Sequence, residues 1–272
     1  MFGSGGGTSS YADLDTTELI VLWGSNARET HPVMFLRMLQ GIRNGAKLVV
    51  IDPRRTLSAE VAHTHLPIKI GADIALANAM ANVILSEGLE NRAFIEHATL
   101  HFDQYRVAVQ RYTPEYAAPI TGIPASQIRD FARLYAISKT AMLCWTLGIT
   151  EHHNATDNVF ALINLSLLTG HVGRPGSGLA PLRGQNNVQG GGDMGAIPDR
   201  LPGFQHVSDD ERRKRFEQAW GVAIQPTPGK HQTAMMHAMG RGELRGMYVI
   251  GENPVQSDAD AHRVRHPVSY TH

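Results

Sequence analysis

The stretch Glu18-Leu19-Ile20-Val21-Leu22-Trp23-Gly24-Ser25-Asn26 decides the fold, because an apolar run leads directly into a polar turn that contains glycine. A short apolar run that ends at such a turn predicts a buried strand. Residues 33–44 then carry apolar side chains at helical spacing and end before Gly45, which predicts a helix with a glycine after its last turn. A buried strand followed by a helix is the repeating unit of a parallel sheet.

The same unit recurs along the chain. Further strands are expected at 47–51, 66–70, 141–147 and 246–250, and further helices at 74–86, 91–97, 103–111, 125–139, 155–168, 209–220 and 233–241. The sequence therefore predicts an α/β protein. We expect a Rossmann-like lobe whose parallel sheet has helices on both faces, together with part of a second α/β lobe.

Composition limits the classes of partner. The 272 residues contain 25 basic and 25 acidic side chains, so the charge gives no reason to expect nucleic acid or an anionic membrane surface. Cys144 is the only cysteine, which excludes a disulfide, a four-thiolate zinc site and an iron–sulfur cluster within these residues. The sequence has neither a run of 18 apolar residues nor a signal-peptide pattern, and we expect a cytoplasmic location without membrane contact.

Polar or glycine-bearing turns follow the expected strands. They comprise residues 24–26, 52–55, 71–73, 148–152 and 251–254. Because the carboxyl ends of parallel strands share one edge of a sheet, we expect these turns to meet at a crevice that binds a nucleotide-bearing ligand. The first strand is not followed by Gly-x-Gly-x-x-Gly, so an ordinary nicotinamide dehydrogenase is not supported.

Residues 182–195 form the most unusual segment, with one cation, four side-chain amides and five glycines in fourteen positions. Glycine lets the backbone approach a ligand, and the amides both donate and accept hydrogen bonds. Arg183 adds a planar fork of donors suited to a carboxylate. The alternative interpretation is a surface cluster of turn residues.

Several motifs occur in an order that resembles the molybdopterin oxidoreductase family, and within it the catalytic subunits of formate dehydrogenase. They are Gly24-Ser25-Asn26 with His31-Pro32, Ile51-Asp52-Pro53-Arg54, Leu147-Gly148-Ile149-Thr150, Leu168-Thr169-Gly170-His171-Val172-Gly173, residues 183–193, and Gly251-Glu252-Asn253-Pro254. The resemblance spans about residues 2 to 260. It implies a bis-molybdopterin guanine dinucleotide cofactor with molybdenum or tungsten. It also implies oxidation of formate to carbon dioxide, with two electrons passing through iron–sulfur clusters to electron-transfer subunits or another redox partner.

The resemblance assigns roles to individual residues. Arg183 matches the arginine that orients formate, and Gly184, Gln185 and Asn187 match positions against the pterin. The turns that match one guanine dinucleotide arm contain Asn26, Asp52, Arg54, Gly71, Asp73, Gly148 and Thr150, and those that match the other arm contain Gly251, Glu252 and Asn253. Gly24 and His31 are further expected cofactor-binding residues. We therefore expect residues 1–183 to form the first cofactor-binding lobe, 184–262 an incomplete second lobe, and 263–272 an unassigned tail.

The histidine pairs invite a metal-site interpretation. Adjacent His152 and His153 diverge and have no suitably spaced third ligand, and His63 and His65 have no nearby carboxylate or thiol. We therefore predict that these histidines are structural or support other residues of the site, and we predict no metal ligand in this chain.

The sequence also departs from the family pattern. In the family, a metal-binding cysteine or selenocysteine and a histidine shortly precede the motif that here is Phe2-Gly3-Ser4-Gly5, and the [4Fe-4S] cysteines lie further upstream. Neither group is present in this sequence. We therefore expect an internal piece of a longer subunit that is inactive alone, and one hypothesis is that an upstream selenocysteine codon was read as a stop. The alternatives are a non-catalytic or different-substrate member of the family and an unrelated nucleotide-binding α/β protein.

Overall fold

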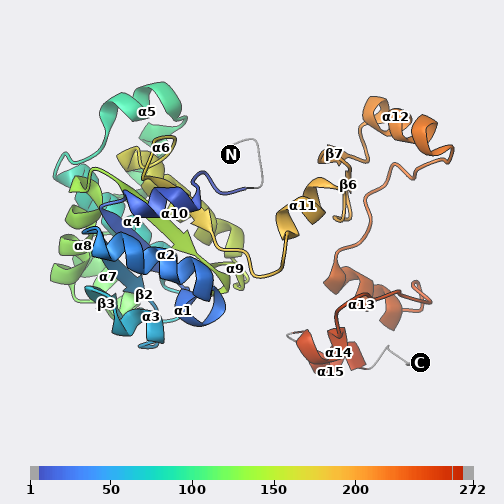
Figure 1. Cartoon of the computed structure of the whole chain (residues 1–272), viewed down its shortest axis with the longest axis horizontal. Coiled ribbons are helices and arrows are strands. Elements are labelled where there is room, and N and C mark those ends of the chain that lie inside the picture. Colours follow the sequence, from blue (N-terminus) through green and yellow to red (C-terminus); the bar gives the residue numbers. More distant parts are fainter. Residues whose placement is uncertain (1–5, 259, 266–272) are drawn as a thin grey trace. The chain divides into compact units, whose positions relative to one another are not determined.

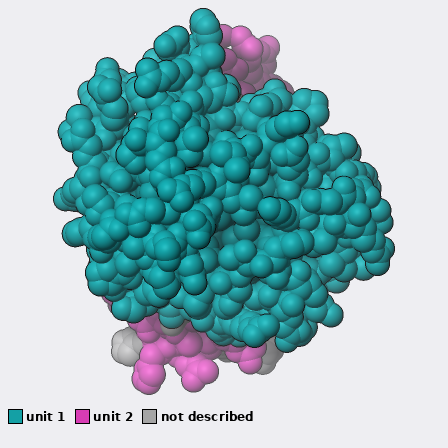
Figure 2. Space-filling model, turned by 90° about the vertical axis from the view of Figure 1, so that its left-hand side faces the viewer, with its two compact units in different colours: residues 1–186 teal, residues 187–272 magenta. Residues whose placement is uncertain are grey.

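The computed structural model describes residues 6–258 and 260–265. The chain forms two compact units, Met1–Asn186 and Asn187–His272 (Figures 1 and 2). The sequence places a lobe boundary after Arg183, close to this division. The motif Phe2-Gly3-Ser4-Gly5 and the end of the expected tail lie outside the described residues.

Unit 1 has a central sheet with helices on both faces (Figure 1). Its elements are η1 (Tyr11–Asp15), β1 (Leu19–Trp23), α1 (Ala27–Thr30), α2 (Pro32–Arg43), β2 (Lys47–Ile51), α3 (Leu57–Glu60), β3 (Thr64–Leu66), α4 (Asp73–Ser86), α5 (Arg92–Ala98), α6 (Phe102–Val109), α7 (Pro114–Thr121), α8 (Ala125–Ile137), β4 (Ala141–Trp145), α9 (Leu147–Thr150), α10 (Ala155–Thr169) and β5 (Gly178–Pro181). The predicted α/β class and the predicted strands at 18–23, 47–51 and 141–147 are confirmed, with small shifts at their ends.

The five strands are parallel and lie in the order β3-β2-β1-β4-β5. Trp23, the last residue of β1, pairs with Ile51 on one side and with Trp145 on the other. From β1 the chain builds outward through β2 and β3 and then crosses back to place β4 on the opposite side of β1. The order thus reverses between β1 and β4, which is where open α/β sheets bind ligands.

Alternation along β1 supplies both halves of the core. Leu19, Val21 and Trp23 pack into the cluster that contains residues of α4, α8 and α10. Ile20 and Leu22 point to the opposite face and pack with residues of α2 and α3. All five side chains are fully buried, as expected for a central strand of a parallel sheet covered on both faces.

The structure of unit 1 differs from the sequence expectations in several places. The strand predicted at 66–70 is β3, which ends at Leu66 because Pro67 has no N–H to donate to a neighbouring strand. The outer strand β5 and the helices η1, α1, α3 and α7 were not predicted. Finally, part of the turn predicted after β4 is the short helix α9.

Unit 2 contains α11 (Val188–Asp193), β6 (Arg200–Leu201), β7 (Gln205–His206), α12 (Asp210–Trp220), α13 (Gln232–Gly240), α14 (Pro254–Ser257) and α15 (Ala261–Arg265). Part of the glycine-rich segment 182–195 forms the helix α11, and Asn187 Oδ1 caps it by accepting from the Gly190 N–H at 3.2 Å. The predicted strand at 246–250 is wrong. No strand of the described residues pairs with it, and its Tyr248 side chain is 89% exposed. None of the described helices is long and apolar enough to cross a bilayer.

Candidate functional site

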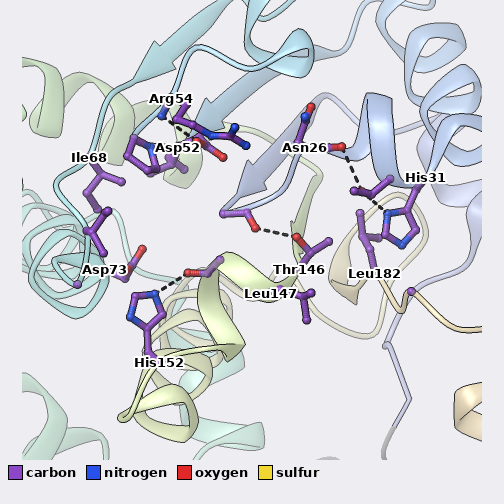
Figure 3. A pocket seen from close by; sticks show the side chains of 18 of the residues that line it. Asn26, His31, Asp52, Arg54, Ile68, Asp73, Thr146, Leu147, His152 and Leu182 are labelled. Carbon is purple, nitrogen blue, oxygen red and sulfur yellow. Dashed lines mark hydrogen bonds between the residues drawn. The ribbon is translucent and has the colours of Figure 1, made fainter. Parts of the chain in front are cut away.

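A cavity of about 470 Å³ opens at the carboxyl ends of β1, β2 and β4, at the position where the strand order reverses (Figure 3). Its volume is in the range of pockets that hold small molecules and cofactors. Its walls are Gly24, Asn26, Thr30, His31, Ile51, Asp52, Pro53, Arg54, Ile68, Lys69, Ile70, Gly71, Asp73, Thr146, Leu147, Gly148, His152, Leu182, Gly184 and Gln185. All of these residues belong to unit 1.

Two glycines bring the turns after β1 and β4 into direct contact. The Gly148 N–H donates to the Gly24 carbonyl at 3.1 Å, and the Thr146 hydroxyl donates to the same oxygen at 2.7 Å. A Cβ atom on Gly148 would lie 2.6 Å from the Gly24 Cα, and Gly24 itself has a φ of 58°. Both positions therefore require glycine for backbone packing at the floor of the cavity.

The turn after β2 is organised by Asp52, which is 8% exposed. Its Oδ1 accepts from the Arg54 N–H at 2.8 Å, an Asx turn that holds the two residues at the rim. Lys69 lines the same pocket, and its Nζ donates to the Pro119 carbonyl at 2.9 Å. Arg54 and Lys69 thus provide cations suited to phosphate, and the Asp52 carboxylate provides an acceptor suited to a ribose hydroxyl or a guanine N–H.

Asp73 is the second buried carboxylate of the pocket, at 6% exposure. Burial raises the pKa of Asp73, while the hydrogen bond from Trp23 Nε1 and the positive potential of His152 oppose that rise. His152 lies nearby (Figure 3), and its Nε2 donates to the Gly148 carbonyl at 2.9 Å. Ala72 holds the N-cap position of α4, and Asp73 is the first residue of the helix.

A second group of contacts joins the turn after β1 to the segment after β5. Thr30 Oγ1 lies 3.1 Å from the Asn26 carbonyl oxygen and 2.8 Å from Nδ1 of His31. Nε2 of the same ring lies 2.6 Å from the carbonyl oxygen of Arg183. Residues far apart in the sequence therefore meet at one wall of the cavity (Figure 3).

The structure gathers most of the predicted cofactor-binding residues in this cavity. Those that line it are Gly24, Asn26, His31, Asp52, Arg54, Gly71, Asp73, Gly148, Gly184 and Gln185. Thr150 and Arg183 are exposed and do not line it, although Arg183 lies between the lining residues Leu182 and Gly184. Asn187 caps α11 in unit 2, where Gly251, Glu252 and Asn253 form the turn before α14.

Sequence reasoning did not assign roles to several lining residues. Lys69 follows the strand end at Leu66, and Thr146 directly follows β4, so their positions at strand ends were the available signal. The only sequence signal for Thr30 as a lining residue was its position directly before His31.

His63 and His65 each make a hydrogen bond with the main chain, whereas His152 lines the cavity. His63 Nδ1 accepts from the Leu48 N–H at 3.0 Å, and His65 Nε2 donates to the Asp52 carbonyl at 2.9 Å. Within residues 6–258 and 260–265, no group of three or more His, Cys, Asp or Glu side chains is arranged to hold a metal ion.

Comparison with known proteins gives a consistent result. A family model described as molybdopterin oxidoreductase matches residues 3–269. The chain is 42% identical over 264 residues to formate dehydrogenase H of Escherichia coli, covering 97% of this chain and 37% of that protein. It is 40% identical over 263 residues to the F420-dependent formate dehydrogenase subunit alpha of Methanocaldococcus jannaschii, covering 97% of this chain and 39% of that protein.

Among solved structures, acetylene hydratase from Pelobacter acetylenicus superposes with a TM-score of 0.63 at 25% identity. The match covers 86% of this chain and 34% of that chain. The chain thus spans between a third and two fifths of the length of the relatives that it matches.

Proposed function

Because this chain belongs to the molybdopterin oxidoreductase family, we propose that it supplies cofactor-binding and substrate-positioning residues of a formate dehydrogenase. The proposed reaction oxidises formate to carbon dioxide and releases one proton and two electrons. One observation supports the proposal: the chain is 42% identical to a formate dehydrogenase, and Arg183 lies between Leu182 and Gly184, which both line the cavity.

The family implies a molybdopterin cofactor that holds molybdenum or tungsten. The pocket fits the nucleotide part of such a cofactor, since it combines the cations Arg54 and Lys69 with the buried carboxylates Asp52 and Asp73. We propose the bis-molybdopterin guanine dinucleotide form, with one guanine dinucleotide arm in this pocket. Thr150 is proposed to contact the same arm, Gly184, Gln185 and Asn187 the pterin, and Gly251, Glu252 and Asn253 the other arm.

Arg183 is proposed to bind formate. A guanidinium donates two parallel hydrogen bonds to a carboxylate, which fixes the orientation of its C–H bond, and its positive charge attracts the anion. When bound, the metal-bearing cofactor accepts the two electrons. This division of roles leaves the protein to bind, orient and shield the substrate.

We also propose that the electrons leave through a [4Fe-4S] cluster to electron-transfer subunits or another redox partner. A cytoplasmic location is proposed as well. Cys144 is the only cysteine and is fully buried in β4, so these 272 residues cannot supply the thiolates of such a cluster. We therefore expect the isolated chain not to reduce a dye with formate. Steady formate-dependent dye reduction by the isolated chain would contradict this.

A different substrate is the second candidate. Acetylene hydratase shares the fold but is named for another reaction, so the fold alone does not select formate. Two points favour formate: the higher identity to formate dehydrogenases, and the guanidinium of Arg183, a group that can hold a carboxylate by two parallel hydrogen bonds.

The test uses a formate dehydrogenase that carries these residues. Arg183→Ala should raise the formate KM by at least about tenfold, the value of a charge-assisted hydrogen bond, and leave bound molybdenum or tungsten unchanged. Arg183→Lys should recover only part of the affinity, because an ammonium lacks the planar fork. Loss of the metal with unchanged formate affinity in the reloaded variant would contradict the role given to Arg183.

A further inference from the structure

We propose that His31 is a positioning residue that holds the main chain at Arg183, and that formate affinity depends on this contact. The link to formate rests on the proposed function, whereas the contact itself does not. The proposal gives His31 a role in substrate binding through Arg183, in addition to its place in the wall of the pocket.

The hydrogen bond has a defined direction. A carbonyl oxygen carries no proton, so Nε2 of His31 must donate to the Arg183 carbonyl across the 2.6 Å that separates them. Nδ1, on the other side of the ring, faces Thr30 Oγ1 at 2.8 Å. Both ring nitrogens are thus engaged, which fixes the orientation of the imidazole.

The backbone of His31 is also held on both sides. His31 is the single residue between α1 and α2, and its N–H donates to the Ala27 carbonyl at 2.8 Å. Its own carbonyl accepts from the Phe35 N–H at 2.9 Å, and Phe35 is 2% exposed. The ring therefore extends from a well-packed helix junction.

On the other side of the contact, Arg183 lies just beyond the edge of the sheet. The Leu182 N–H donates to the Trp145 carbonyl at 2.9 Å and continues the pairing of β5 with β4 past Pro181. Leu182 is 9% exposed, whereas residues 183–187 are exposed. The hydrogen bond from His31 is thus a tether at the point where the chain leaves the sheet, and it fixes the peptide plane that follows Arg183.

Limited proteolysis of the 272-residue chain tests the tether directly. Trypsin cuts after arginine, and the oxygen that His31 holds belongs to the peptide bond that would be cut at Arg183. Cleavage requires that this oxygen be released, so its rate follows the opening of the contact. His31→Ala should speed cleavage after Arg183 by about tenfold, within the range for loss of one hydrogen bond. Cleavage after Lys230 in unit 2 serves as the internal reference.

Two variants complete the design. His31→Gln keeps an N–H donor and should restore part of the protection, while His97→Ala, at an exposed histidine of α5, should leave the rate at Arg183 unchanged. Equal rates at Arg183 in the wild-type chain and His31→Ala would overturn the tether.

The formate readout requires a formate dehydrogenase that carries these residues. His31→Ala should raise the formate KM more than it lowers kcat and leave bound metal unchanged, and His31→Gln should restore part of the affinity. Loss of metal without a change in formate affinity would overturn the positioning role. If the unaltered enzyme does not oxidise formate, the proposed function fails, whereas the proteolysis result still decides the tether.

Discussion

The indole Nε1–H of Trp23 donates a hydrogen bond to Asp73 Oδ1 at 2.8 Å, joining the last residue of β1 to the first residue of α4. Trp23 is fully buried and Asp73 nearly so, hence the carboxylate is held away from water with a neutral donor as its partner. Burial outweighs that donor and raises the pKa of Asp73. In its ionised form, this pocket-lining carboxylate therefore lowers the stability of the fold.

Asp73→Asn should change how stability depends on pH. The folded-state pKa lies above that of an exposed carboxyl, so the folded wild type binds this proton more tightly and loses stability as pH rises through the raised pKa. The amide oxygen of asparagine still accepts from Trp23 but does not titrate. In urea unfolding, the free energy of unfolding of the wild type relative to that of the variant should be lower at pH 7 than at pH 3.5. A constant difference would show that Asp73 is not responsible.

Gly148→Ala should destabilise the sheet. The new Cβ would lie 2.6 Å from the Cα and the carbonyl oxygen of Gly24, and overpacking against backbone costs roughly 1–3 kcal/mol. Gly184→Ala is the matched control, because a Cβ at that position meets no atom within 4 Å among the described residues. Urea midpoints of the two variants compare them. Equal stability of Gly148→Ala and Gly184→Ala would mean that the contact between the turns after β1 and β4 does not contribute to stability.

His171 should make the protein sensitive to acid. His171 is 1% exposed, its Nε2 donates to the Tyr135 carbonyl at 2.9 Å, and burial lowers the pKa of His171 from 6.5 to about 4. Between these values the unfolded chain binds the proton and the folded chain does not. Stability should therefore fall by roughly 3 kcal/mol as pH falls through this range.

To measure this acid sensitivity, the unfolding of the chain is compared with that of His171→Gln at several pH values. Both proteins carry Trp220→Phe, so that fluorescence reports only Trp23 and Trp145 of unit 1. The variant should be less stable at pH 7, because the ring's packing is lost, but should show a shallower loss between pH 6.5 and pH 4. Parallel curves for the two proteins would assign the acid sensitivity to other groups.

Arg54→Ala should weaken nucleotide binding. Guanosine diphosphate, used as a probe for the nucleotide end of the cofactor, should bind the isolated chain and raise its Tm. Removing the Arg54 cation should raise the Kd by about tenfold, since hydrogen bonds to charged groups are worth about 1.5–3 kcal/mol. Arg55→Ala, which alters the next residue but no wall of the pocket, should leave the Kd unchanged. Equal Kd values for the two variants would place the phosphates elsewhere.

The interior strands were predictable because apolar runs such as Leu19–Trp23 are the characteristic pattern of a strand covered on both faces. The outer strand β5 was missed because Gly178 begins it and Pro181 ends it, and neither residue favours a strand. The helix α7 contains Pro119, which does not fit a helical pattern. Residues 246–250 have the pattern of a strand, but a strand forms only where a second strand pairs with it. The spacing of apolar residues does not show whether such a partner exists.

The location of the pocket was predictable for a different reason. The turns after parallel strands lie at the same edge of a sheet whatever the order of the strands. Asn26, Asp52 and Gly148 could therefore be assigned to one site without knowledge of the strand order. The contact between His31 and Arg183 joins residues that are 152 positions apart. It depends on how the segment after β5 leaves the sheet, and no local pattern encodes that.

Cys144 gives the protein a chemical reporter of its own. Its side chain is fully buried in β4, and burial raises the pKa of its thiol to about 12. An alkylating reagent can react only after β4 has been uncovered and the thiol has lost its proton in water. The labelling rate of this single thiol therefore reports how often the central sheet opens, and no engineered label is needed.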